Sequence, residues 1–196
     1  MFDIEYQTAI RKGMVIRMIP VFLYGKNDKS LSVHLRTALA KNGGVLHISE
    51  NKFSADPIHT LAHFMLYEFE HAPVFNMDTG IIVFKKELPD HVSLSIPSGF
   101  QAIVESDNQP ALALLKKLRV PAITCGMSVS DTLSISSHEE NSASISLQRD
   151  VMNVINEKIE ECEITVKMTE EISSYSLLAI SAVLLLSDRF QNEIEI

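Results

Sequence analysis

Residues 20–30 read Pro20-Val21-Phe22-Leu23-Tyr24-Gly25-Lys26-Asn27-Asp28-Lys29-Ser30. The apolar half is typical of a buried strand, and the polar half is typical of a short turn. An approximately helical apolar stripe follows over residues 33–39, with Ser30 as its expected N-cap and Gly43-Gly44 as its end. The apolar run at 45–48 predicts a second strand. This stretch therefore predicts a strand–helix–strand unit with two parallel strands and a right-handed crossover.

The turn between the strand and the helix has features of a phosphate-binding loop. In such loops backbone N–H groups and a helix N-terminus converge on the anion, a lysine adds charge, and a Ser or Thr hydroxyl ligates magnesium. Gly25, Lys29 and Ser30 could supply these groups. We therefore predict a nucleotide-binding loop, with Ser30 as a magnesium ligand if a nucleotide binds, formed by Gly25, Lys26, Asn27, Asp28, Lys29 and Ser30.

Asp28 departs from this pattern, because a glycine normally precedes the lysine. A Cβ at position 28 conflicts with the positive φ that glycine tolerates. A carboxylate about 4 Å from a phosphate charge also costs about 1 kcal/mol in water, and several times more in a partly buried site. Lys26 and Lys29 would offset part of this repulsion. The alternative is an ordinary strand–turn–helix connection whose turn is solvated.

Further along the chain, apolar patterns predict alternating helices and strands. Helices are expected over about 56–70, where Pro57 suits the first helical position, and over 110–118; strands are expected over 80–84, 102–104 and 121–126. From residue 128 to 149, and again from 162 to 168, apolar residues alternate with polar ones, which favours half-exposed antiparallel strands. Residues 151–161 are expected to form either a short helix or a charged connection.

The last predicted helix, Ser174 to about Arg189, is apolar nearly all round. It is expected to pack against the sheet, or to leave one face for a second subunit. Together the patterns predict one α/β domain over residues 1–196. Its sheet is expected to be mostly parallel, of the P-loop type and flanked by helices, with a small antiparallel section in the C-terminal half.

Composition restricts the partners and the compartment. The formal charge is -8, from 25 acidic and 17 basic residues, which disfavours nucleic acid and anionic lipid surfaces as partners. The first residues lack the basic region of a signal peptide, and the longest apolar stretch, 177–186, is about half a membrane span. We therefore expect a cytoplasmic protein that has no membrane contact.

Two other groups of residues have ordinary interpretations. His59 and His63 would lie one turn apart on the helix predicted over 56–70, but Thr60 stands where a zinc hydrolase of this spacing needs Glu. We interpret them as part of a polar helix face. Cys125 lies in an apolar strand and is expected to be a small core residue rather than a nucleophile. No catalytic residue is predicted.

Four segments, in this order, resemble the central ATP-binding domain of the Mur ligase family. The loop is similar to the family's Gly-Thr-Asn-Gly-Lys-Thr, with Gly25, Asn27 and Lys29 retained and Ser30 a conservative change. The other three segments are similar to the family's strand ending in Asn-x-Asp-Asp, its Ile-Thr-(Tyr/Phe)-Gly strand and its Ala-rich helix, and they are 102–108, 122–126 and 174–183. The resemblance implies the fold, with ATP and magnesium as the cofactors of an amide ligase.

The chain also departs from the family. The family's magnesium-binding Glu, its His and its carbamylated lysine have no clear equivalents, and Glu68 is the nearest candidate for the Glu. The asparagine of the family's last helix appears as Ser173 or Ser176. The family's outer domains, which bind the sugar nucleotide and the incoming amino acid, have no counterpart in these 196 residues. The resemblance therefore implies a truncated and degenerate central domain.

Three functions follow as hypotheses. The first is a binding or regulatory module without ligase activity, which binds nucleotide weakly and acts as a homodimer or with a protein partner. The second is an ATP-dependent amide ligase or ATPase that is completed by a partner protein. The third is a purely structural interaction protein.

Overall fold

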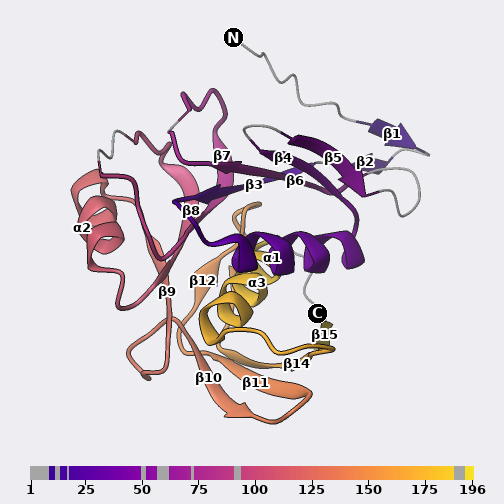
Figure 1. Cartoon of the computed structure of the whole chain (residues 1–196), viewed down its shortest axis with the longest axis vertical. Coiled ribbons are helices and arrows are strands. Elements are labelled where there is room, and N and C mark those ends of the chain that lie inside the picture. The colour runs from indigo at the N-terminus through magenta and orange to yellow at the C-terminus, as the bar shows by residue number, and fades with distance from the viewer. Residues whose placement is uncertain are drawn as a thin grey trace.

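The structure is a computed structural model that describes residues 9–11, 14–16, 18–49, 52–56, 62–71, 73–90, 94–187 and 193–196. The described residues form an eleven-stranded sheet and three helices (Figure 1). In sheet order the strands are β15 (Glu193–Glu195), β14 (Cys162–Lys167), β11 (Ser142–Leu147), β10 (Leu133–His138), β9 (Ala122–Gly126), β8 (Gly99–Glu105), β7 (Thr79–Phe84), β3 (Ile19–Tyr24), β6 (Phe64–Phe69), β4 (Val45–Ser49) and β5 (Lys52–Asp56). Two small pairs stand apart, β1 (Ala9–Arg11) with β2 (Met14–Ile16), and β12 (Val151–Met152) with β13 (Lys158–Ile159). The helices are α1 (Lys29–Lys41), α2 (Gln109–Leu118) and α3 (Ser174–Leu186).

The centre of the sheet is parallel. Each neighbouring pair from β4 through β6, β3, β7, β8 and β9 to β10 runs in parallel. The pairs β10–β11 and β11–β14 are antiparallel, as is β4–β5 at the other edge. The predicted fold class is therefore confirmed: a mostly parallel α/β sheet with flanking helices and an antiparallel section in the C-terminal half.

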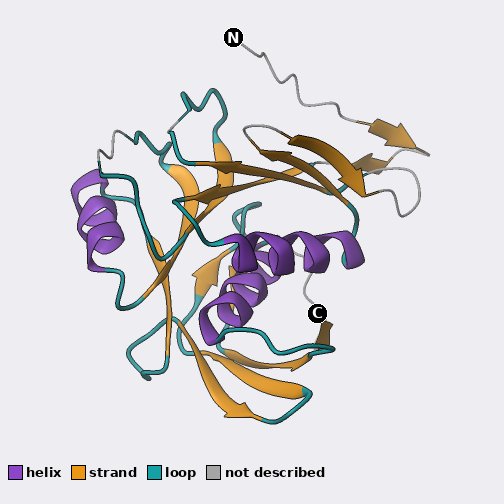
Figure 2. Cartoon of the chain, in the orientation of Figure 1, coloured by secondary structure: helices purple, strands orange, loops and turns teal. Residues whose placement is uncertain are grey.

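The helices divide between the two faces of the sheet (Figure 2). One core cluster joins α1 and α3 to the sheet, and a second cluster joins α2 to the other face. All residues of α3 from Tyr175 to Leu186 are buried. Its apolar surface is covered by the sheet on one side and by α1 on the other, which confirms the prediction of a buried helix. Among the described residues, no helix is long and apolar enough to cross a bilayer.

The helix predicted over 56–70 is wrong. Residues 57–61 lie outside the described residues, and β6 occupies 64–69 as a strand between β3 and β4. A strand in the middle of a parallel sheet is covered on both faces, so its apolar residues run nearly without interruption. Phe64, Met65 and Phe69 then share the spacing of a helical stripe by coincidence. The aromatic residues of this segment favour a strand.

Residues 151–161 form a connection rather than a helix. The small hairpin of β12 and β13 is closed at Asn156, whose φ is 64°. The Asn153 side-chain oxygen accepts hydrogen bonds from the backbone N–H groups of Ile155 (3.1 Å) and Glu157 (2.8 Å). These bonds satisfy the turn locally, as asparagine side chains commonly do.

Burial of α3 can be tested by truncating one of its side chains. Leu184→Ala removes a fully buried side chain and should lower the free energy of unfolding by about 2–5 kcal/mol, because the cavity cannot collapse completely. Val33→Ala on α1, where the residue is 50% exposed, should change it by less than about 0.5 kcal/mol. Urea denaturation measures both values. Equal losses from the two variants would contradict the burial of α3.

Candidate functional site

The candidate site lies at the end of β3, where the next strands of the chain are placed on opposite sides of β3 in the sheet. From β3 the chain passes through α1 to β4 on one side, while β7 flanks β3 on the other side. In open parallel sheets, ligands bind at the carboxyl ends of the strands at such a point. The predicted loop, Gly25 to Ser30, leaves β3 at this edge, and its last two residues, Lys29 and Ser30, already belong to α1.

The loop is fixed to the segment that follows β7. The Lys26 N–H donates to the Glu87 carbonyl at 2.8 Å, and the Asn27 side-chain amide donates to Glu87 Oε2 at 3.0 Å. Gly25 has φ 137°, and a Cβ there would collide with the Glu87 carbonyl and the Lys85 side chain. A glycine is therefore required at position 25 by both its backbone geometry and the close approach of the two segments.

Asp28 has a different role from the one expected. Its φ is -80°, so the predicted conflict with a positive φ is wrong, and the left-handed residue is Asn27 at 56°. The Asp28 Oδ1 atom accepts the Leu31 N–H at 3.0 Å, which makes Asp28 the N-cap of α1 in place of Ser30. A carboxylate is favourable there because it satisfies a free N–H and faces the positive end of the helix dipole. Asp28 thus occupies the position where a phosphate would interact with the helix.

The side chains of Lys26, Lys29 and Ser30, which were also predicted to bind a nucleotide, do not converge on one point. Lys26 Nζ lies 3.2 Å from Asp90 Oδ2. The Lys29 side chain is exposed. Ser30 is exposed too, with its hydroxyl 3.4 Å from His34 Nδ1. The Ser30 hydroxyl therefore lies beside a histidine rather than beside an acidic group.

Sequence reasoning missed a buried polar cluster beneath the loop, which we call the Glu68 cluster: Ser32, His47, Glu68 and Lys85. The Ser32 hydroxyl donates to Glu68 Oε1 at 2.7 Å, and the Lys85 ammonium donates to the same oxygen. His47 Nε2 lies 3.7 Å from Glu68 Oε2, which is beyond hydrogen-bond distance. Ser32, His47 and Lys85 are 6%, 9% and 3% exposed. The four residues come from α1, β4, β6 and the end of β7, so only the fold brings them together.

The cluster is charged at neutral pH. Burial raises the pKa of the Glu68 carboxyl, but His47, Lys85 and Ser32 outweigh that effect and lower the pKa to about 2. Among the described residues, neither ring nitrogen of His47 has a hydrogen-bond partner. The sequence signal that could have located the cluster is one charged residue at the end of each apolar strand, Glu68 after 64–67 and Lys85 after 80–84.

The backbone at Lys85 is held from several sides. Its N–H donates to the Tyr24 carbonyl at 2.8 Å, and its carbonyl accepts the Asn108 side-chain amide at 2.9 Å. The Tyr175 hydroxyl of α3 donates to the carbonyl of the preceding residue, Phe84. Asn108 also caps α2, because its side-chain oxygen accepts the Ala111 N–H at 3.2 Å. The backbone position of Lys85 is therefore fixed by β3, α2 and α3.

Among the described residues, the remaining candidates form no second site. His63 Nδ1 lies 2.7 Å from the Gly43 carbonyl, in the segment that leads into β6, and His59 lies outside the described residues. Cys125 is fully buried, and burial raises the pKa of its thiol, which fits the expected core residue. Across the described ranges, no group of three or more His, Cys, Asp or Glu residues could hold a metal ion.

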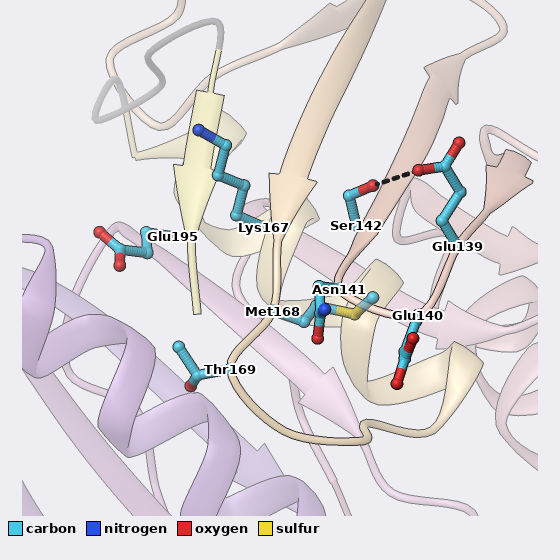
Figure 3. Close-up of a pocket in the computed structure, with 8 residues that line it drawn as sticks. All are labelled: Glu139, Glu140, Asn141, Ser142, Lys167, Met168, Thr169 and Glu195. Atoms are coloured by element: carbon cyan, nitrogen blue, oxygen red, sulfur yellow. Dashed lines mark hydrogen bonds between the residues drawn. The ribbon is translucent and has the colours of Figure 1, made fainter.

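An open groove of about 600 Å³ lies at the antiparallel end of the sheet (Figure 3). It is lined by Glu139, Glu140, Asn141, Ser142, Lys167, Met168, Thr169 and Glu195. The only hydrogen bond drawn among these side chains joins Ser142 to Glu139, at 3.2 Å. None of the predicted loop residues lines this groove, which is acidic overall.

Comparison with known proteins supports the fold. No protein-family model matches the chain, and no curated protein matches it. Among solved structures, UDP-N-acetylmuramate:L-alanyl-gamma-D-glutamyl-meso-diaminopimelate ligase from Neisseria meningitides aligns with a TM-score of 0.51 at 13% identity, over 86% of this chain and 61% of that one. UDP-N-acetylmuramoyl-L-alanyl-D-glutamate–2,6-diaminopimelate ligase aligns with a TM-score of 0.49 at 9% identity, over 89% of this chain and 44% of that one. The chain thus spans about half the length of these ligases, and its fold is Mur-ligase-like.

Removing the Glu68 charge should lower the free energy of unfolding. Glu68→Gln leaves the buried Lys85 ammonium without a charged partner and should lower the free energy of unfolding by about 3–5 kcal/mol. The matched control is Glu105→Gln, because Glu105 pairs at 3.1 Å with Lys86, whose side chain is 56% exposed. That change should cost less than about 1 kcal/mol. Similar losses in urea denaturation would show that the Glu68–Lys85 pair is not a buried ion pair.

The same carboxylate should make stability depend on pH. Because the pKa of Glu68 falls from 4.5 to about 2 on folding, its contribution is complete above pH 4.5 and disappears as the pH falls toward 2. The wild-type protein should therefore lose more stability across this interval than Glu68→Gln does. Urea denaturation at a series of pH values measures the difference. Parallel pH profiles would contradict the lowered pKa.

Proposed function

We propose that this chain is a Mur-ligase-like domain that acts as a binding or regulatory module and has no amide-ligase activity of its own. Its loop, Gly25 to Ser30, binds phosphate weakly at most. The observation that carries the proposal is the Asp28 carboxylate at the N-terminus of α1, where it accepts the Leu31 N–H. The fold similarity supports a Mur-ligase-like domain. Because one fold can host many functions, the chemistry of the domain is inferred from the residues of the site.

The loop electrostatics disfavour a nucleotide. A helix N-terminus attracts an anion through its free N–H groups and its dipole, and Asp28 already supplies that anion. A phosphate must displace the carboxylate or lie beside it, at a cost of about 1 kcal/mol in water and several times more when partly buried. Of the two loop lysines, Lys26 pairs with Asp90, which leaves Lys29 to offset the repulsion.

The residues present do not fit the magnesium ion that the resemblance implies. A magnesium ion near α1 requires oxygen ligands that are free to coordinate it. Glu68 Oε1 already accepts both the Ser32 hydroxyl and the Lys85 ammonium, and the ammonium would repel a divalent cation. The Ser30 hydroxyl, predicted as the magnesium ligand, lies 3.4 Å from His34 Nδ1, and His34 Nε2 in turn lies 3.5 Å from Glu170 Oε1. This arrangement further supports a module without ligase chemistry.

The partner is proposed on the same basis. We propose a homodimer or a protein partner, but α3 cannot supply the contact, because it is covered within the chain. Large apolar side chains are exposed at Phe53 on the edge strand β5, and at Met127 and Val129 after β9. These positions are the candidates for protein contact.

Calorimetry with Mg-ATP tests the loop. The wild-type protein should bind Mg-ATP weakly at most, whereas Asp28→Asn should bind it at least roughly tenfold more tightly, a gain of about 1.4 kcal/mol. Asparagine keeps the helix cap and removes only the charge. Asn27→Gly is the control, since it alters the loop but retains the Asp28 carboxylate. Binding of Mg-ATP by the wild-type protein as tight as that by Asp28→Asn, or release of phosphate from ATP by the wild-type protein, would overturn the proposal.

A further inference from the structure

The Lys85 ammonium has the environment of a bound cation. Its side chain is only 3% exposed, and it donates to Glu68 Oε1, which also accepts the Ser32 hydroxyl. His47 presents a second kind of ligand, because Nε2 lies 3.7 Å from Glu68 Oε2 and both ring nitrogens lack a hydrogen-bond partner within the described residues. The Glu68 carboxylate thus contacts the Lys85 ammonium and the Ser32 hydroxyl through one oxygen and faces the His47 imidazole with the other.

The surrounding backbone keeps this charge in place. Lys85 is bonded through its N–H to Tyr24 and through its carbonyl to Asn108. The ammonium is therefore part of the framework, in contrast to Lys86, which is 56% exposed and pairs with Glu105. A divalent cation bound to the Glu68 carboxylate would lie close to the ammonium on Oε1, and like charges at short distance in a partly buried site repel strongly.

We propose that the Lys85 ammonium fills a cation site formed by Ser32, His47 and Glu68, and that removing it opens this site to a divalent metal ion. The wild-type protein therefore carries its own counter-ion at this edge of the sheet and needs no divalent cation there. This inference goes beyond the proposed function, because it concerns the cluster alone and requires no nucleotide.

The ligand chemistry identifies the probe. Carboxylate and hydroxyl oxygens suit Mn²⁺, and a neutral imidazole can also coordinate first-row divalent metals. His47 is the residue whose hydrogen bonding the Glu68–Lys85 ion pair leaves incomplete. It favours the ionised Glu68 carboxylate, but both of its buried ring nitrogens lack a hydrogen-bond partner within the described residues. In the absence of the ammonium, the imidazole and the carboxylate become two ligands on one ion, and water completes its coordination.

The test titrates Mn²⁺ alone, with no nucleotide present, into the wild-type protein, Lys85→Ala and Lys86→Ala. Paramagnetic resonance of free Mn²⁺ reports binding, and thermal denaturation reports stabilisation by mass action. Lys85→Ala should bind Mn²⁺ at least about tenfold more tightly than the other two proteins. Its melting temperature should rise with added Mn²⁺, and a chelator should reverse the rise.

Two further variants locate the metal. Lys85→Ala combined with Glu68→Gln, or with His47→Ala, should lose the gained Mn²⁺ affinity. If Lys85→Ala unfolds without metal, Mn²⁺ should restore its circular dichroism, since binding is then coupled to folding. Failure of Lys85→Ala to bind or refold with Mn²⁺ would overturn the inference, as would wild-type Mn²⁺ binding that Glu68→Gln abolishes. Neither result depends on Asp28. Failure of this inference can therefore be distinguished from failure of the proposed function, which rests on Asp28.

Discussion

The buried ion pair between Glu68 and Lys85 is the interaction on which this edge of the molecule depends. Glu68 lies opposite Leu23 in the pairing of β6 with β3, and Lys85 follows Phe84, which lies opposite Tyr24. The pair therefore spans the end of β3, and Ser32 joins α1 to it. Burying two charges has a large desolvation cost, which is offset only when each charge keeps hydrogen-bond partners. Gly25 and Lys26 also contact the segment after β7. This contact requires Lys85 to stay where the ion pair holds it.

Two ions of this edge are supplied by the chain itself. The N-terminus of α1 attracts an anion, and Asp28 provides one; the Glu68 carboxylate attracts a cation, and Lys85 provides one. A ligand-binding edge usually keeps polar groups that only the ligand satisfies. Here the same fold satisfies them internally, which makes a stable domain without a bound nucleotide physically reasonable. Among the described residues, the His47 ring nitrogens are the exception, because they have no hydrogen-bond partner, and they belong to the Glu68 cluster rather than to the loop.

Sequence patterns identified the elements whose apolar residues have a clear period. The β3–α1–β4 unit, α2, α3 and the alternating strands β10, β11 and β14 all have such patterns, and they were predicted close to their observed positions. The strand at 64–69 was missed because continuous apolar residues on a doubly covered strand can imitate a helical stripe. The same error prevented prediction of the Glu68 cluster, because a helix over these residues would have placed Glu68 away from β3. The pairing of Glu68 with Lys85 joins residues 17 positions apart on strands separated by β3, so no local pattern could show it.

The two ions supplied by the chain differ in how easily a ligand could replace them. Asp28 is partly exposed, and losing its bond to the Leu31 N–H removes a helix cap, which costs about 1 kcal/mol. Displacing the buried Lys85 ammonium breaks its ion pair and leaves the partly buried Glu68 carboxylate without its partner, which costs about 3–5 kcal/mol. A ligand of ordinary affinity can therefore compete with Asp28 but not with Lys85. If any ligand regulates this domain at its carboxyl edge, its contact must be through the loop and α1, while the Glu68 cluster remains closed beneath them.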